Sequence, residues 1–177
     1  MNNTTRVLLA ASIVLALGAC SKKVKEETTV AETTAPATTA PVADGRYTPA
    51  DLDTDACLRQ RTVYFDFDQD TLRPEFQAVM ACHAKYLNDR SESRVTLEGN
   101  ADERGTREYN LGLGERRGNA VSGALQGAGG SAGQITVVSY GEERPTCNDS
   151  AEACWQQNRR VEIKLTPMTE GSTKPAN

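Results

Sequence analysis

The chain has 177 residues and carries 24 acidic against 20 basic side chains, a net charge of −4 at pH 7. This mildly acidic balance argues against a nucleic-acid partner, which would call for a basic face. Once the N-terminal export signal and a polar low-complexity stretch are set aside, the length leaves room for one folded domain.

The N-terminus has the features of a bacterial export signal. Arg6 precedes an apolar run, Val7–Leu17, that is too short to cross a bilayer as a stable helix. The following Leu-Gly-Ala-Cys resembles the lipobox of bacterial lipoproteins, in which cleavage makes the cysteine the new N-terminus and its sulfur is lipidated. The resemblance implies a signal peptide over residues 1–19 and an anchor of acyl chains such as palmitate on Cys20. The alternative is ordinary signal cleavage that leaves Cys20 as a free thiol.

Residues 20–56 are predicted to form a disordered tether behind the lipidated cysteine. The segment is rich in Thr, Ala and Pro and nearly lacks large apolar side chains, so burial cannot offset the entropy lost on ordering. Aspartate after the lipidated cysteine tends to signal retention in the inner membrane, so Ser21 implies the outer membrane. Residues 167–177 are also polar and are expected to be a flexible tail, which leaves residues 57–166 for the domain.

The predicted domain alternates strand and helix patterns. Apolar and polar residues alternate from Val63 to Phe67, which indicates a strand, and apolar residues recur at helical spacing after Pro74. The order β-α-β-α-β-(α)-β predicts an α+β fold, with parallel crossovers and helices covering one face of a small sheet. We predict strands at 63–67, 95–99, 135–139 and 161–165, and helices at about 74–87, 106–126 and 151–157.

Five cysteines occur in the chain. Setting Cys20 aside leaves an even number in a secreted protein, which indicates two disulfides with three possible pairings. Cys147 and Cys154 bracket one loop and are expected to pair, which would join Cys57 to Cys82. Zinc is the rival interpretation, but Cys-x-x-Cys spacing is missing and the chain has a single histidine. We therefore expect no metal.

An acid and two bases flank the junction between the second strand and the second helix. Asp102 lies in the turn after the strand, and Arg116 and Arg117 lie on the helix. Taken alone, Asp102 could cap the helix and the arginines could form a solvated helix face. Together they suit a ligand that bears both an ammonium and a carboxylate, because a planar guanidinium binds a carboxylate in bidentate fashion.

The acidic run Phe65-Asp66-Phe67-Asp68-Gln69-Asp70 ends the first strand. A calcium loop would need glycine where Thr71 stands and glutamate where Gln77 stands, so calcium is not expected. For its later acids the simplest interpretation is a solvated strand end with a helix cap. One arginine of Asn158-Arg159-Arg160 is expected to pair with an acid near the site.

The sequence Asn-Ala-Asp-Glu-Arg-Gly-Thr-Arg-Glu-Tyr-Asn-Leu-Gly-Leu-Gly-Glu-Arg-Arg, residues 100–117, resembles a family signature. The family is the peptidoglycan-binding domain shared by outer-membrane protein A and the peptidoglycan-associated lipoproteins, and Phe-Asp-Phe-Asp at 65–68 resembles it as well. The resemblance spans about residues 62–166. It implies a two-layer sandwich with a small mixed sheet and helices on one face.

The resemblance also implies a ligand, meso-diaminopimelate of peptidoglycan stem peptides. Asp102 would receive its ammonium and Arg117 its carboxylate, and Asn100 stands where the family usually has histidine. The expected contact residues are Asp102, Arg117, Phe65, Asp66, Phe67, Asn100 and Leu113.

The function that follows is non-covalent binding without catalysis or cofactor. A lipid-anchored protein of the outer membrane, facing the periplasm, would tether that membrane to the cell wall. As part of the Tol-Pal system for envelope integrity and cell division, it would also bind TolB and other Tol proteins. One alternative is a peptidoglycan-processing enzyme that uses Asp66 and Asp102 as acid and base. Another is a wall anchor for a different envelope machine.

Overall fold

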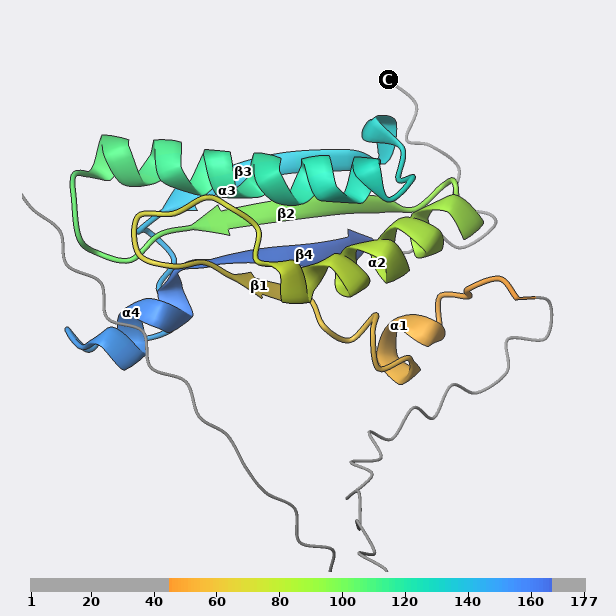
Figure 1. Cartoon of the computed structure of the whole chain (residues 1–177), viewed down its shortest axis with the longest axis horizontal. Helices are drawn as coiled ribbons and strands as arrows, with labels where there is room; N and C mark the ends of the chain where they lie inside the picture. The colour runs from red at the N-terminus through yellow and green to blue at the C-terminus, as the bar shows by residue number, and fades with distance from the viewer. Residues whose placement is uncertain (1–44, 167–177) are drawn as a thin grey trace, which may run out of the picture. The chain divides into compact units, whose positions relative to one another are not determined.

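The computed structural model describes residues 45–166 (Figure 1). The predicted signal peptide, the lipidation site Cys20, the tether up to residue 44 and the tail from 167 lie outside the described residues. Among the helices of residues 45–166, none is long and apolar enough to span a membrane.

The elements follow the predicted alternation, with a further short helix at the start. The strand and helix patterns of the sequence are confirmed, although β1 is shorter than expected and ends before Phe65. In chain order the elements are α1 Asp51–Thr54, β1 Thr62–Tyr64, the 3-10 turn η1 Pro74–Phe76, α2 Gln77–Asp89, β2 Arg94–Asn100, α3 Arg107–Gly127, the 3-10 turn η2 Ala132–Gln134, β3 Ile135–Gly141, α4 Glu152–Asn158 and β4 Arg160–Thr166.

The four strands form one mixed sheet in the order β1-β4-β2-β3. β2 and β3 are parallel and are joined through α3, as expected for a crossover, whereas β4 runs antiparallel to both β1 and β2. The prediction of a parallel crossover into the last strand was therefore wrong. The seven residues of α4 span only about 10 Å, too little to return along a strand of about 23 Å. The chain consequently re-enters the sheet at the end where β3 leaves it (Figure 1).

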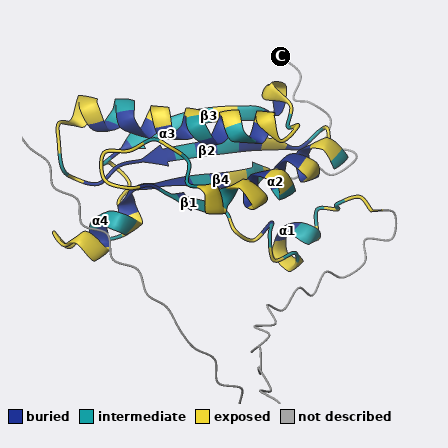
Figure 2. Ribbon diagram, viewed as in Figure 1, coloured by how far each residue is buried: buried dark blue, intermediate teal, exposed yellow. Residues whose placement is uncertain are grey.

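Helices α2 and α3 cover one face of the sheet, and each carries several buried residues (Figure 2). The alternation of each strand decides which residues point inward: Val95 and Leu97 of β2 are buried, whereas Thr96 and Glu98, which alternate with them, are partly exposed. This arrangement is the expected two-layer sandwich. The core consists of Val63, Phe65, Val79, Met80, Leu87, Val95, Leu97, Val121, Leu125, Val161 and Ile163.

The folded region begins earlier than the sequence predicted. Residues 45–56 were assigned to the tether, but this segment contains α1, and Leu52 is buried against Leu58 and Tyr86. The disulfide between Cys57 and Cys82 then ties the segment to α2. The prediction failed because one buried leucine in a polar stretch gives no periodic signal, whereas tertiary packing is enough to order it.

Both favoured disulfides are confirmed. Cys57 pairs with Cys82, with Cα atoms 6.3 Å apart, and Cys147 pairs with Cys154, with Cα atoms 5.3 Å apart. The first joins the α1–β1 connection to α2. The second closes the loop that leads into α4.

Helix α3 lies unusually close to β2 and β3 because glycines form the contact. A Cβ atom on Gly114 would lie 2.9 Å from the carbonyl oxygen of Gly99 and would also clash with the hydroxyl of Ser139. Real side chains do not fit at such distances, so only glycine permits this approach. The close packing fixes the helix against the end of β2, where the candidate site begins.

Candidate ligand-binding site

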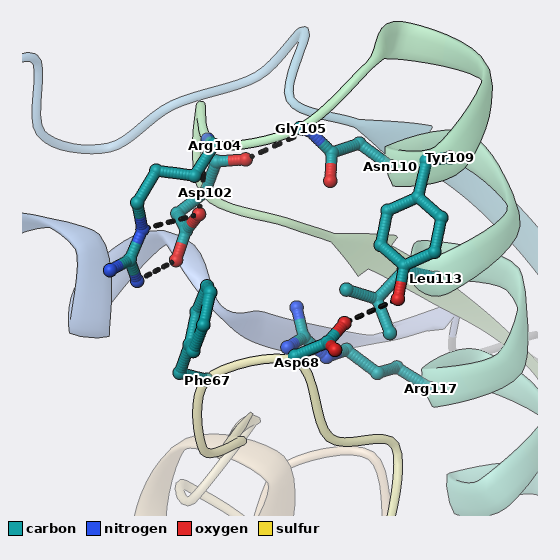
Figure 3. Close-up of a pocket in the computed structure, with 9 residues that line it drawn as sticks. All are labelled: Phe67, Asp68, Asp102, Arg104, Gly105, Tyr109, Asn110, Leu113 and Arg117. Atoms are coloured by element: carbon teal, nitrogen blue, oxygen red, sulfur yellow. Dashed lines mark hydrogen bonds and ion pairs between the residues drawn. The ribbon is translucent and has the colours of Figure 1, made fainter.

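A pocket of about 210 Å³ opens where the loop after β1, the turn after β2 and the first half of α3 meet (Figure 3). It brings together acidic, basic and aromatic side chains from segments far apart in the sequence. Its lining residues are Phe67, Asp68, Asp102, Arg104, Gly105, Tyr109, Asn110, Leu113 and Arg117.

The turn between β2 and α3 is shaped by backbone requirements. Gly105 has φ of +116°, which side-chain-bearing residues rarely adopt, so the chain can reverse sharply there. Thr106 then caps α3, since its hydroxyl accepts a hydrogen bond from the backbone N–H of Tyr109 at 3.2 Å. Asn110 braces the turn by donating to the carbonyl oxygen of Asp102 at 3.1 Å. Asp102 is thereby held at the mouth of the pocket.

Asp102 is buried and paired with two arginines. Its carboxylate lies 2.7 Å from the Nη2 atom of Arg104 and 3.2 Å from the Nη1 atom of Arg159. Burial raises the pKa of the Asp102 carboxyl, but the hydrogen bonds from Arg104 and Arg159 outweigh burial, so its pKa lies below its ordinary value. Asp102 is therefore a carboxylate at neutral pH. Each of its oxygens already accepts two hydrogen bonds.

Arg104 is the more exposed of the two arginines that pair with Asp102. Its side chain is about a third exposed, whereas that of Arg159 is buried. The guanidinium carbon of Arg104 lies 4.0 Å from the ring centre of Phe67 and 4.1 Å from that of Trp155. Glu152 adds a second acid, 3.6 Å from Nη1 of Arg104. Arg104 thus contacts two rings and two carboxylates.

Arg117 forms the floor of the pocket. Its three nitrogens donate to backbone carbonyls: Nε to Gln69 at 2.8 Å, Nη1 to Asn100 at 2.9 Å and Nη2 to Asp66 at 3.1 Å. Burial lowers the pKa of the Arg117 guanidinium to about 10, which leaves it charged at neutral pH.

The floor position of Arg117 has a consequence for any ligand. A guanidinium has five N–H groups, so two remain without an acceptor among residues 45–166. The side chain lines the pocket but has no solvent-exposed surface. A ligand can therefore reach those two N–H groups only after neighbouring side chains move slightly.

The structure separates the other predicted contact residues into two groups. Phe67 and Leu113 line the pocket beside Asp102 and Arg117. Phe65 is instead fully buried in the core, with its ring 5.3 Å from the guanidinium carbon of Arg117. Phe65 therefore packs in the core and does not line the pocket, because it lies two residues after buried Val63 and faces the same side of the sheet.

Asp66 and Asn100 also lie outside the pocket lining. The side chain of Asp66 is exposed, 3.8 Å from Arg73, and only its backbone oxygen reaches Arg117. Asn100 is buried and donates to the carbonyl oxygen of Glu98 at 2.9 Å. Both residues contact Arg117 through their backbone carbonyl oxygens, and a side-chain motif does not predict such a contact.

Several residues of the site were not predicted from the sequence. For Arg104 the sequence does hold a signal, because an aspartate often accepts a hydrogen bond from the backbone two residues later in a turn. The backbone N–H of Arg104 donates to the Asp102 carboxylate in this way, at 3.1 Å. Of the two adjacent arginines at the start of β4, Arg159, directly before the strand, pairs with Asp102, whereas Arg160, its first residue, pairs with Glu162. Only the fold decides between them.

Among residues 45–166, no group of three or more His, Cys, Asp or Glu side chains is placed to hold a metal ion.

Comparison with known proteins gives the family of this chain. Residues 64–160 match the model of the OmpA family, more than half of the chain. The chain belongs to the OmpA family. The match covers β2, α3 and β3 in full, and it includes every residue that lines the pocket.

OmpA-family proteins with similar sequences include two lipoproteins of nearly the same length. The peptidoglycan-associated lipoprotein of Pasteurella multocida is 40% identical over 91% of this chain and 97% of its own length. That of Haemophilus influenzae is 42% identical over the same shares. Both are named as peptidoglycan-associated lipoproteins, in keeping with the expectation of binding without catalysis.

A solved structure supports the fold. The crystal structure of the peptidoglycan-associated lipoprotein from Burkholderia pseudomallei is 40% identical and superposes with a TM-score of 0.64. The match covers 66% of this chain and 98% of that chain. The OmpA-like mixed sheet with helices on one face is thereby confirmed.

Proposed function

We propose that this protein binds peptidoglycan non-covalently, by holding the diaminopimelate side chain of a stem peptide in the pocket of Asp102 and Arg117. The observation that carries the proposal is that the carboxylate of Asp102 and the guanidinium of Arg117 line the same small pocket. The names of the related lipoproteins point to the same ligand. Diaminopimelate is suited to this pocket, because its side chain ends in an ammonium and a carboxylate.

The carboxylate of the ligand finds free donors in the pocket, whereas its ammonium must compete for an acceptor. Arg117 is charged and keeps two N–H groups for the ligand carboxylate, which its planar fork can bind in bidentate fashion. Asp102 is the partner of the ammonium, but its acceptor capacity is filled by Arg104 and Arg159. The ammonium therefore displaces the more exposed of the two, Arg104, from Asp102.

Binding at this pocket gives the protein a tethering role. With the lipid on Cys20 in the outer membrane and the domain in the periplasm, the chain links that membrane to the cell wall. We further propose membership of the Tol-Pal system, with TolB as a partner, on the similarity to the related lipoproteins. Affinity isolation from periplasm with and without TolB tests this partner. Recovery of another envelope machine in place of TolB would contradict it.

Isothermal titration with matched stem peptides tests the ligand. A peptide with diaminopimelate should bind, and one with lysine should bind at least tenfold more weakly, because lysine lacks the carboxylate that Arg117 receives. Equal binding of the two peptides would contradict the role of Arg117. The absence of binding of the diaminopimelate peptide would contradict the proposed function.

A variant of the protein tests the role of Asp102. Asp102→Asn keeps the size of the side chain but removes the charge, and it should reduce affinity for the diaminopimelate peptide at least tenfold. Arg116→Ala is the matched control. Arg116 is adjacent to Arg117, is half exposed, pairs with Asp70 at 3.0 Å and does not line the pocket. Its removal should leave the affinity unchanged.

A further inference from the structure

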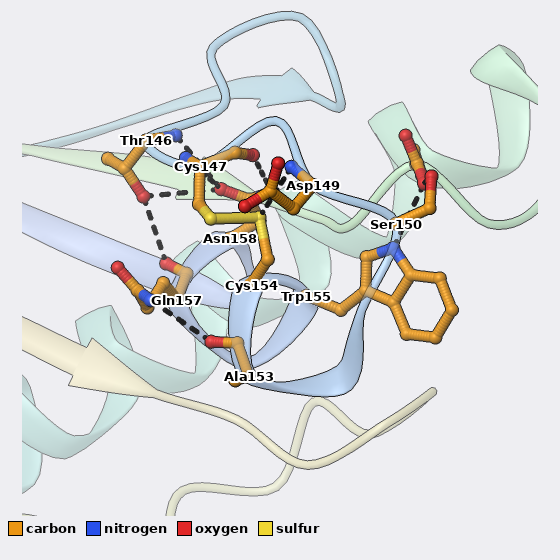
Figure 4. Close-up of a disulfide and its surroundings, with 10 residues drawn as sticks. Thr146, Cys147, Asp149, Ser150, Ala153, Cys154, Trp155, Gln157 and Asn158 are labelled. Atoms are coloured by element: carbon orange, nitrogen blue, oxygen red, sulfur yellow. Dashed lines mark hydrogen bonds between the residues drawn. A yellow bond between two sulfur atoms is a disulfide. The ribbon is translucent and has the colours of Figure 1, made fainter.

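A disulfide-closed loop stands beside the Asp102–Arg104 pair. Cys147 and Cys154 close the loop that leads from β3 into α4 (Figure 4). The side chain of Asn158 fastens the same loop, because it accepts from the backbone N–H of Thr146 at 2.9 Å and donates to the carbonyl oxygen of Cys147 at 2.8 Å. Cys154 and Asn158 are the two buried residues of α4. The disulfide and this amide therefore hold α4 in place.

Helix α4 and the residue directly after it place three side chains next to Asp102 and Arg104. Trp155 places its ring against Arg104, and its Nε1 atom donates to Glu103 at 3.0 Å. Glu152 contacts Arg104 at 3.6 Å, and Arg159, directly after the helix, contacts Asp102 at 3.2 Å. The position of α4 therefore decides which partners surround Arg104.

Helix α4 cannot hold that position by its own helical stability. It has seven residues, and isolated helices shorter than about 12 residues are marginal in water. Its N-cap residue is Ala151, and no side chain among residues 45–166 caps the helix there. External fastening is therefore required, and the Cys147–Cys154 bond supplies it covalently.

We propose that the Cys147–Cys154 disulfide is a positioning element of the ligand pocket. By fixing α4, it keeps Glu152 and Trp155 next to Arg104, where they receive its guanidinium when the ligand ammonium takes Asp102. This inference rests on the proposed binding of diaminopimelate. Without the fixed α4, Arg104 loses this alternative partner and competes with the ligand for Asp102.

The second disulfide provides a matched control. Cys57 lies in the α1–β1 connection and Cys82 in α2. Neither lines the pocket, and neither is bonded to the α4 loop among the described residues. Its loss should lower the stability of the fold but leave Arg104 and its partners unchanged. The control therefore distinguishes a general loss of stability on removing a disulfide from a change in the position of α4.

The experiment measures the affinity of the full-length protein for the diaminopimelate stem peptide and the emission of Trp155, the only tryptophan of the chain. The double variant Cys147→Ser/Cys154→Ser should bind roughly five- to tenfold more weakly, because the ligand must then order α4. Its tryptophan emission should shift to the red. Cys57→Ser/Cys82→Ser should lower the Tm with affinity and emission unchanged.

A variant that keeps both disulfides covers the case in which the double variant does not fold. Glu152→Gln removes the alternative charge for Arg104 and should also weaken binding several-fold. Wild-type affinity in either the Cys147→Ser/Cys154→Ser protein or Glu152→Gln would overturn the inference and leave the proposed function intact. Absence of binding by the wild-type protein would overturn both.

Discussion

The buried guanidinium of Arg117 donates to the carbonyl oxygen of Asn100 at 2.9 Å and so joins the middle of α3 to the end of β2. Two further hydrogen bonds reach the loop after β1. A residue expected to bind a ligand is thus also a structural cross-link between three segments. Loss of Arg117 should affect the fold as well as the ligand.

Arg117→Ala should destabilise the domain by about 3 kcal/mol, because three carbonyl oxygens lose their donor and a cavity forms. Chemical denaturation followed by circular dichroism measures the change. Arg116→Ala, at an exposed pair, should change the unfolding free energy by less than about 1 kcal/mol. Similar values for the two variants would refute the cross-linking role.

Gly114→Ala should destabilise the domain by about 1–3 kcal/mol, because its methyl group would meet the backbone of Gly99 and the side chain of Ser139. Gly123→Ala in the same helix is the control. Nothing lies within 4 Å of a Cβ at Gly123, so alanine there should stabilise the helix by up to about 1 kcal/mol. Thermal unfolding of both variants checks the opposite signs; a stabilising Gly114→Ala would show that α3 does not need this close approach.

His83 should make the unfolding free energy depend on pH below about 6.5. Burial lowers the pKa of His83 below its ordinary value, although its Nε2 atom lies 3.0 Å from the carbonyl oxygen of Gln60. The unfolded chain then binds a proton below about pH 6.5 that the folded chain does not. The stabilisation is complete above that pH and is lost as the pH falls toward the pKa of the folded state.

The measurement is the unfolding free energy at pH 7 and at pH 5.5, for the wild-type protein and for His83→Gln. The chain has one histidine. Carboxylates with lowered pKa values change the unfolding free energy mainly below about pH 5. The difference between the two pH values should therefore shrink in the variant. An equal difference in both proteins would exclude His83 as its source.

Leu52→Ala should destabilise the domain by about 2 kcal/mol, because Leu52 is buried against Leu58 and Tyr86. Asp53→Ala is the neighbouring control, at a side chain that is 86% exposed. Denaturation of both proteins measures whether residues 45–56 belong to the fold. If Leu52→Ala behaved like Asp53→Ala, the domain would begin after α1.

The sequence by itself determined the order of the main strands and helices, the local pairing of Cys147 with Cys154 and the placement of Asp102 and Arg117 at one strand–helix junction. These features depend on local periodicity and short spacings. Helical and strand patterns are set by neighbouring residues, and a loop of eight residues brings its two cysteines together without knowledge of the rest.

Only the tertiary structure decided what surrounds those two residues. It placed β4 antiparallel between β1 and β2, and so brought Arg159 to Asp102 across 57 positions. It turned Phe65 into the core and left Phe67 at the pocket, and it added Trp155 and Glu152 next to Arg104. These contacts join segments far apart in the chain, and packing and charge neutralisation in the folded state select them, not local propensity.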